Sequence, residues 1–383
     1  MKLSHIHGQD SWRFNSDMVD AAITRQGGHL APVRFRLPHG VVEPFSIAPW
    51  AEEKIGPKLP ALLQSLRGDF FCAPFGGNEK PYRGEHHPPH GETANAQWKL
   101  EEIRKSKAET ELHLSLETKV RTGRINKMIR LRRGETSLYC RHVLSNMSGK
   151  MNLGHHATLK FPDAPGSGFV DTSPISFAQV LPTTFEQPSQ RGYSSLKPGA
   201  FFSKLDQVPA LDGTLADLSR YPARRGFEDL AMVVHQATPE FAWTAVTFPK
   251  QRYVWFALKD PRVLRSTVLW ISNGGRHYPP WNGRHINVMG LEDVTSYFHM
   301  GLAESTRSNP ISERGIATHL SLNSTTPLAI NYIMAVAAIP RKWGRVKTIT
   351  AGPHGITLHS TAGSDISVTL DLDFLYLGSR RTA

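Results

Sequence analysis

The sequence predicts an all-β fold, a large antiparallel β-sandwich with few short helices. Short apolar runs alternate with polar residues along most of the 383 residues, which is typical of strands with one buried face. Glycine (31 residues) and proline (27 residues) are frequent enough to supply turns between successive strands. Many short strands at this spacing favour a sandwich, and an apolar content of 39% can fill its core.

The predicted strands follow one another with turn residues between them. The clearest alternation lies in residues 109–120, where leucines occupy every second position from Leu112 to Leu116 and polar residues fill the positions between them. We predict strands within residues 41–48, 111–119, 126–132, 137–144, 231–235, 243–247, 253–258, 266–270 and 286–291.

Other parts of the chain depart from this pattern. Residues 49–66 contain leucines at helical spacing and form the one amphipathic helix that we expect. Residues 163–221 are rich in proline, serine, glycine and threonine, so we expect long loops that carry binding groups. Residues 355–360 and 365–372 read as a hairpin. We predict a single domain over residues 1–383, in which the strands of residues 341–383 extend the sheet.

The charge balance is basic, with 45 Lys and Arg against 33 Asp and Glu, a net charge of +12 and a pI near 9.7. Such a balance can favour an anionic ligand or a nucleic acid. The charge is dispersed, however, and the basic run 127–133 alternates with apolar residues as a half-solvated strand does. We therefore expect no nucleic-acid partner.

Membrane insertion and cysteine chemistry are not expected either. The longest apolar run, residues 333–339, is shorter than the roughly 20 residues that a spanning helix requires. The first residues lack the apolar stretch of about 7 to 15 residues that marks a secretory signal, so a cytoplasmic location is expected. Two cysteines, Cys72 and Cys140, form neither a disulfide framework nor a cysteine-based zinc site.

Three separated segments place proton-transfer side chains near turns or strand ends. They contain His90, the tandem His155 and His156, and Glu292. Imidazole and carboxyl groups have reference pKa values of about 6.5 and about 4.3, so they can exchange protons with the hydroxyl and ring oxygens of a sugar near neutral pH. The order His, His, Glu is therefore a hypothesis of acid–base function.

Each segment also has a structural alternative. His86, His87 and His90 could ligate a metal, but zinc would need a further ligand and two prolines restrict this backbone, so no metal is predicted. The tandem histidines could flank a bend at the surface. Glu292 could lie on an edge strand facing water, although a carboxylate in an apolar strand is costly to bury without a partner.

The order of these segments resembles the aldose 1-epimerase, or galactose mutarotase-like, superfamily. Residues 68–77, Gly-Asp-Phe-Phe-Cys-Ala-Pro-Phe-Gly-Gly, then His90-Gly91, then a strand with Trp98 are similar to one family element. Residues 151–162 look like the element that ends at a histidine, and residues 270–294 are similar to the late strand with a glutamate. Asp293 stands where the family more often has proline.

Residues 21–33, an apolar strand running into Gly27-Gly28, also resemble the family's opening. The likeness covers roughly residues 10–340 through motifs whose joint order is more specific than any one of them. It implies the galactose mutarotase-like supersandwich, with a sugar cleft on a concave sheet face. It also implies an isomerase that interconverts the α and β anomers of a free sugar without a cofactor.

The resemblance assigns roles to particular residues. Glu292 would be the general base on the anomeric hydroxyl, and a tandem histidine the acid on the ring oxygen. Adjacent strand residues point to opposite faces, so only one of His155 and His156 can do this, and we favour His156. His90 and Arg67 would donate hydrogen bonds to the sugar.

Further residues are candidates for binding the monosaccharide. Trp270 and Trp281 could stack on the apolar face of a pyranose, although core aromatics are the alternative. Asp229 is the nearest match to an acidic family residue that grips sugar hydroxyls. The predicted substrate-binding set is Arg67, His155, Asp229, Trp270 and Trp281.

Other functions fit the same fold. One is a non-catalytic carbohydrate-binding protein, since a fold does not fix the chemistry. Another is a lyase or hydrolase of this architecture. A sugar phosphate is a third alternative because Arg83, Arg276 and Arg284 lie near the proposed cleft in sequence. The sequence specifies neither the sugar nor the oligomeric state.

Overall fold

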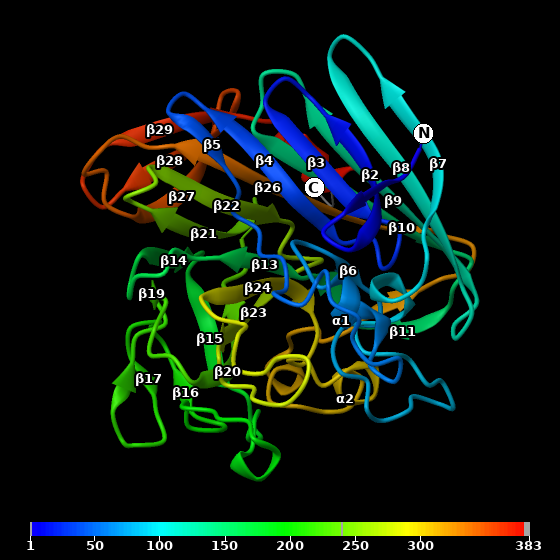
Figure 1. Cartoon of the computed structure of the whole chain (residues 1–383), viewed down its shortest axis with the longest axis vertical. Helices are drawn as coiled ribbons and strands as arrows, with labels where there is room; N and C mark the ends of the chain where they lie inside the picture. Colours follow the sequence, from blue (N-terminus) through cyan, green and yellow to red (C-terminus); the bar gives the residue numbers. More distant parts are fainter. Residues whose placement is uncertain (1, 239, 379–383) are drawn as a thin grey trace.

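A computed structural model describes residues 2–238 and 240–378 and shows a β-sandwich built from antiparallel sheets (Figure 1). A nine-stranded sheet and an eight-stranded sheet share one apolar core, to which a five-stranded N-terminal sheet also contributes. The prediction of an all-β sandwich with few short helices is confirmed.

The nine-stranded sheet has the order β19-β14-β21-β22-β26-β10-β9-β8-β7. One of its faces packs on the shared core and the other on a C-terminal cluster. Its strands are β7 Lys99–Lys105, β8 Glu109–Thr118, β9 Gly123–Arg132, β10 Ser137–Ser145, β14 Gly168–Thr172, β19 Arg220–Tyr221, β21 Ala242–Phe248, β22 Tyr253–Lys259 and β26 Leu328–Ala338.

The eight-stranded sheet carries the candidate site described below. Its order is β16-β15-β20-β23-β24-β12-β6. The eighth strand, β13, also pairs with β24, at the opposite end of that strand from β12. Its strands are β6 Phe71–Cys72, β12 Leu153–His155, β13 Ala157–Lys160, β15 Ile175–Val180, β16 Phe201–Phe202, β20 Phe227–His235, β23 Ser266–Asn273 and β24 Val288–Thr295.

The N-terminal sheet comprises β1 Ser4–Ile6, β2 Gln9–Asn15, β3 Val19–Thr24, β4 Leu30–Leu37 and β5 Gly40–Val42. The predicted strand 41–48 is therefore wrong beyond Val42, because Pro44 interrupts the donor pattern that a ladder needs. Two small sheets pair β11 Gly149–Met151 with β25 Leu320–Leu322, and β17 Val208–Pro209 with β18 Leu215–Ala216.

The C-terminal strands form a sheet of their own. Among the described residues, they pair with one another and with no other strand: β27 Val346–Gly352, β28 Gly355–Ser360 and β29 Asp365–Thr369. The hairpin of β28 and β29 is as predicted except that β29 ends at Thr369, before the predicted end at residue 372. The expectation that residues 341–383 extend the main sheet is corrected. These strands pack across the outer face of the nine-stranded sheet through apolar contacts, and residues 379–383 lie outside the described residues.

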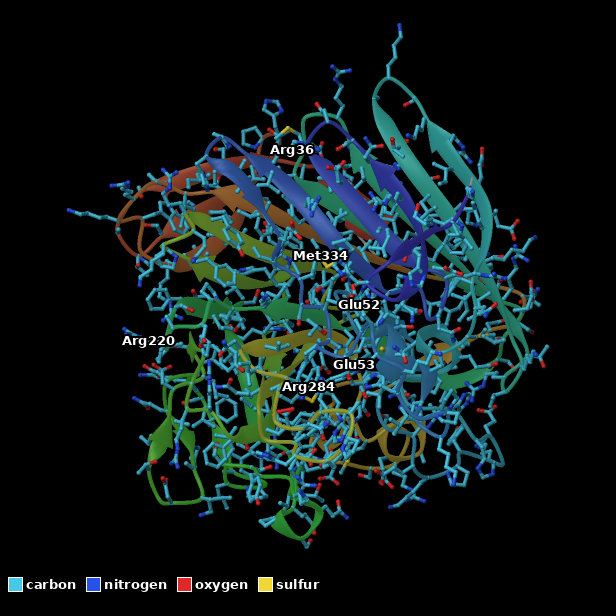
Figure 2. All side chains as sticks on the ribbon, viewed as in Figure 1. Arg36, Glu52, Glu53, Arg220, Arg284 and Met334 are labelled. Carbon is cyan, nitrogen blue, oxygen red and sulfur yellow. The ribbon has the colours of Figure 1, made fainter. Side chains whose placement is uncertain are left out.

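Helices are few and short. They are α1 Ala61–Ser65 and α2 Leu302–Ser305, with 3₁₀ turns at η1 Glu92–Ala94, η2 Pro188–Gln190, η3 Ser312–Arg314 and η4 Leu372–Tyr376. The predicted helix over residues 49–66 is wrong in extent, because Pro57 and Pro60 cannot donate helical hydrogen bonds and leave only α1. The loop before α1 is tied down by Glu53, which Arg284 contacts at 2.5 Å (Figure 2).

Alternation along the eight-stranded sheet separates two environments. In β24, Met289 and Leu291 face the core shared by the sheets, whereas Val294 belongs to a second cluster on the opposite face. In β23, Leu269 and Trp270 divide in the same way. The second cluster surrounds the cavity that forms the candidate site.

No helix within residues 2–238 and 240–378 combines the length and apolar character that a bilayer crossing demands.

Candidate active site

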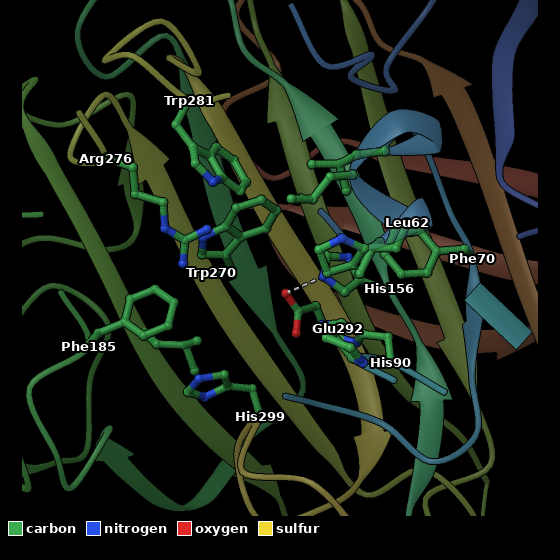
Figure 3. A pocket seen from close by; sticks show the side chains of 15 residues that line it. Leu62, Phe70, His90, His156, Phe185, Trp270, Arg276, Trp281, Glu292 and His299 are labelled. Atoms are coloured by element: carbon green, nitrogen blue, oxygen red, sulfur yellow. Dashed lines mark ion pairs between the residues drawn. The ribbon is translucent and has the colours of Figure 1, made fainter. Parts of the chain in front are cut away.

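A cavity of about 250 Å³ lies on the face of the eight-stranded sheet that points away from the shared core (Figure 3). Its floor comes from β20, β23 and β24, and its walls come from α1 and surrounding loops. The residues that line it are Pro60, Leu62, Leu63, Leu66, Phe70, Pro89, His90, His156, Phe185, Leu230, Trp270, Arg276, Trp281, Glu292 and His299.

The structure brings His156 and Glu292 into direct contact inside this cavity. β13 pairs with β24 so that Ala157 lies opposite Leu291, which sets the preceding His156 beside Glu292. The His156 Nε2 atom is 3.1 Å from Glu292 Oε1, the contact drawn as a dashed line in Figure 3. Both side chains are almost fully buried, and Nδ1 of His156 is 3.1 Å from the Thr158 hydroxyl.

Burial decides the charge of this pair. It raises the pKa of Glu292 well above its ordinary value, against the opposing effect of Arg276. It lowers the pKa of His156 to about 3. Burial therefore favours the neutral form of each group, and a neutral carboxyl group beside a neutral imidazole holds one transferable proton.

His90 lies beside this pair, with its ring centroid 5.0 Å from that of His156. Its Nδ1 atom accepts from the Gly76 N–H at 3.4 Å and lies 3.3 Å from the Cys72 sulfur. Because Nδ1 accepts, Nε2 carries the proton and is a donor. Burial lowers the pKa of His90 well below its ordinary value, and His156 and His299 add to the effect.

The loop that carries His90 depends on a glycine. Gly91 has a φ of +74°, and a Cβ atom there would approach the Ala73 carbonyl oxygen to 2.3 Å. Only glycine allows this close passage, which places His90 over β6. The His-Gly pair of the sequence motif thus has a physical reason in the fold.

Aromatic rings frame the pair. Phe70 stacks on His156 with centroids 4.3 Å apart, and Trp270 meets His156 edge-on at 5.6 Å. Trp281 lies next to Trp270. The two predicted tryptophans, Trp270 and Trp281, therefore both line the cavity, and the buried Nε1 of Trp270 has no hydrogen-bond partner among the described residues.

Arg276 closes the cavity on the side of the tryptophans. Its guanidinium lies 4.5 Å above the Trp281 ring, and Nε donates to Glu186 at 2.6 Å. Glu228 lies farther from Arg276, at 3.9 Å, and burial raises the pKa of Glu228 to about 8. Arg276 thus lies between the carboxyl group of Glu186 and that of Glu228, whose burial favours its protonated form.

Three of the predicted binding residues lie away from the cavity, and this corrects the expectation that they contact a sugar there. Arg67 is fully buried and donates to the carbonyls of Ile6, His7 and Ser65, so it joins the N-terminal sheet to α1. Its three hydrogen bonds leave the guanidinium committed to the backbone.

The other two, His155 and Asp229, face the core shared by the sheets. His155 contacts Asp69 at 2.9 Å and stacks on Tyr332, because it alternates with His156 along the strand. Asp229 accepts from the backbone N–H groups of Ser195 and Leu196, each at 2.9 Å. Its buried carboxylate therefore fixes a loop.

Several cavity residues were not among the predicted site residues. His299 follows β24 by a few residues, and burial lowers its pKa to about 4, with Arg276 adding to the effect. The signal in the sequence that could have identified His299 was its position just after the strand that carries Glu292. Phe185 comes from the long loop region that the sequence analysis expected to carry binding groups. Of the three arginines named as phosphate ligands, Arg276 lines the cavity.

Among the described residues, no group of three or more His, Cys, Asp or Glu side chains is arranged to hold a metal ion.

Comparisons with known proteins show which solved structures have a similar fold. No protein-family model and no curated protein sequence matches the chain. Among solved structures, a galactose mutarotase related enzyme from Lactobacillus acidophilus is similar, with a TM-score of 0.54 and 13% identity over 86% of this chain and 99% of the other.

Two further structures agree with this likeness. A galactose mutarotase-like protein from Clostridium acetobutylicum has a TM-score of 0.56 and 10% identity over 88% of this chain and 98% of the other. A candidate aldose 1-epimerase from Klebsiella pneumoniae has a TM-score of 0.59 and 13% identity over 87% and 80%. At such low identity the likeness concerns the fold, and the chain has the fold of the galactose mutarotase-like proteins.

Proposed function

We propose that this protein is an aldose 1-epimerase-like enzyme that interconverts the anomers of a free monosaccharide, with Glu292 and His156 as its acid–base pair. The observation that carries the proposal is their 3.1 Å contact in the cavity. The anomeric carbon of a pyranose bears both the ring oxygen and the anomeric hydroxyl. Two groups this close can therefore serve both oxygens of one sugar.

The reaction follows from the proton that the pair shares. Transfer of that proton from Glu292 to His156 converts the neutral pair into carboxylate and imidazolium without a change in proton number. The carboxylate then removes the anomeric hydroxyl proton, the C1–O1 bond becomes a carbonyl, and the C1–O5 bond breaks. The ring oxygen takes the imidazolium proton. Rotation about C1–C2 and the reverse steps give the other anomer.

His90 supports this chemistry as a donor. The contacts of His90 with Gly76 and Cys72 involve Nδ1 only. The Nε2–H can therefore donate a hydrogen bond to an oxygen that gains negative charge as the ring opens. Trp270 offers its unpartnered Nε1–H and a ring face for the sugar.

The size of the cavity supports a single sugar ring as the substrate. Its volume of about 250 Å³ falls just below the usual range of small-molecule pockets, roughly 300 to 1,000 Å³. A lyase or hydrolase acting on a polysaccharide needs an open groove for several rings. The cavity therefore favours an epimerase over those alternatives.

Polarimetry on freshly dissolved α-anomers of glucose, galactose and related aldoses tests the proposal. We expect the protein to accelerate the approach to anomeric equilibrium in proportion to its concentration. A rate equal to that of buffer for every aldose would overturn the catalytic proposal. Sugar binding without acceleration would then identify a non-catalytic carbohydrate-binding protein.

The pH profile should have an unusual acid limb. The pair works only while it holds one proton, so activity should fall at about pH 3, where His156 takes a second proton. It should also fall on the alkaline side, where Glu292 ionises at its raised pKa. Catalysed rates corrected for buffer mutarotation measure both limbs. An acid limb near pH 6.5, the ordinary imidazole pKa, would contradict the neutral pair.

Gly290 should be required for the geometry of the pair. A Cβ atom at this position would lie 2.6 Å from Glu292 Oε1 and 3.1 Å from the Trp270 Cβ atom. Gly290→Ala should therefore push the carboxyl group away from His156 and lower the catalysed rate by about a hundredfold, with little loss of thermal stability. Gly56→Ala is the control, since nothing lies within 4 Å of a Cβ atom there. Equal rates for the two variants would contradict this role.

A further inference from the structure

One wall of the cavity offers no polar group to a ligand. It consists of Leu62, Leu63 and Leu66, in and just after α1, together with Phe70. The polar side chains of α1 point elsewhere: Gln64 donates to the carbonyls of Ala51 and Glu53, and Ser65 donates to Gln9. The wall is therefore purely apolar on its cavity side.

The backbone of this wall is also committed. The Leu62 N–H donates to the Asn95 side chain at 3.0 Å, and the Leu63 carbonyl accepts from Trp50 Nε1 at 2.7 Å. A ligand hydroxyl that met this wall would therefore find neither a donor nor an acceptor, and it would lose its bonds to water.

The free polar atoms other than His90 Nε2, which the proposed mechanism uses, lie on the opposite side of the cavity. Trp270 Nε1 and His299 Nδ1 are buried without hydrogen-bond partners among the described residues, and the Arg276 guanidinium lies beside them. Figure 3 shows Leu62 and Phe70 on one side, Arg276 and Trp281 on the other, and Glu292 between them. The cavity thus has an apolar half and a polar half.

The acid–base pair orients a sugar within these halves. The ring oxygen must face His156, which stacks on Phe70 at 4.3 Å. The C5 carbon is bonded to the ring oxygen, so its substituent leaves the sugar on the ring-oxygen side, the side on which Phe70 and the leucine wall line the cavity. The hydroxyls on C2 and C3 lie on the other side of the anomeric carbon, toward Trp270, His299 and Arg276.

We propose that the substrate is a deoxy sugar that carries a methyl group on C5 in place of the hydroxymethyl group of glucose or galactose. The inference rests on the proposed function, which supplies the orientation, and it names the substrate class. A methyl group fills the apolar half, whereas a hydroxymethyl group would be buried there with an unpaired hydroxyl.

Matched sugar pairs test this inference. D-fucose is the C5-methyl counterpart of D-galactose, and D-quinovose is that of D-glucose. We expect catalytic efficiency in polarimetry to be at least about tenfold higher for each methyl sugar. Equal efficiency, or a preference for the hydroxymethyl sugars, would overturn the inference and leave the epimerase proposal standing.

Calorimetry measures the preference for methyl sugars over hydroxymethyl sugars through binding alone, without catalysis. If no sugar is isomerised, the epimerase proposal fails, but tighter binding of D-fucose than of D-galactose still supports an apolar C5 subsite. Equal binding, or no binding of either methyl sugar, overturns the inference.

A variant in the wall provides a second test. Leu63→Asn places an amide in the apolar half, so the ratio of D-fucose to D-galactose efficiency should fall toward one. Leu211→Asn is the matched control, because Leu211 is 58% exposed and does not line the cavity, and it should keep the wild-type ratio. An unchanged ratio in Leu63→Asn, with wild-type thermal stability, would count against the wall as the specificity element.

Discussion

Replacing Glu292 with glutamine is expected to reduce the catalysed mutarotation rate by about 10² to 10⁴, the usual contribution of a general acid–base group. The amide is close in shape to the neutral carboxyl group, so we expect the resting contact of 3.1 Å with His156 Nε2 to be preserved. It cannot take a proton from the anomeric hydroxyl. The defect should therefore appear in kcat while sugar binding persists.

Polarimetry measures the rate, and calorimetry or tryptophan fluorescence measures binding. Glu43→Gln is the matched control because Glu43 is exposed and its ion pair with Arg34 lies on the N-terminal sheet. Its rate should equal that of wild type. A Glu292→Gln protein with wild-type acceleration would remove the carboxyl group from the mechanism, whichever sugar is used.

Replacing Asp293 with alanine should cost about 3 to 5 kcal/mol of unfolding free energy, the usual effect of leaving one member of a buried ion pair alone. Asp293 and Lys259 are both fully buried, and the Lys259 Nζ atom contacts Asp293 Oδ1 directly. Thr267 and Tyr332 donate to the same carboxylate at 2.6 and 2.7 Å. Loss of the carboxylate strands the lysine charge in the core shared by the sheets.

Chemical denaturation monitored by tryptophan fluorescence measures this loss. Adding Lys259→Met to Asp293→Ala removes the stranded charge, so the double variant should recover part of the stability. Asp206→Ala, at an exposed site, should change the free energy by no more than about 0.5 kcal/mol. A double variant as unstable as Asp293→Ala alone would show that the stranded charge is not the cause.

The fold could be predicted from the sequence where alternation is local. The predicted strand of residues 253–258 lies within β22, and that of residues 111–119 overlaps β8 and ends one residue beyond it, because period-two patterns report one buried face. The sequence could not predict which strands pair with each other. β10 lies between β9 and β26, although β26 is nearly two hundred residues away along the chain. Such contacts depend on how the whole chain folds, and a short stretch of sequence carries no information about them.

The candidate site divides in a similar way. His90, His156, Glu292, Trp270 and Trp281 converge on one cavity, and their roles remain predictions. Motif order could suggest them because each lies near a strand end or in a loop that follows one. The sequence could not predict which polar residues near the motifs lie outside the cavity, because burial and hydrogen-bond partners determine this. Arg67 and Asp229 lie near motifs, but both side chains bind the backbone.

The departure from the family pattern at Asp293 also has a structural reason. A proline there could not supply the carboxylate that Lys259 contacts. The difference therefore concerns the interior between the sheets, and it leaves the cavity side of β24 unaltered.

Neighbouring acids on β24 thus have different surroundings, since Glu292 lines the cavity and Asp293 contacts Lys259 in the interior between the sheets. Substitutions on the outward side can change reactivity or selectivity while the inward anchor keeps the framework intact. A directed-evolution library at position 292 that keeps Asp293 should for this reason retain more folded members than a library at position 293.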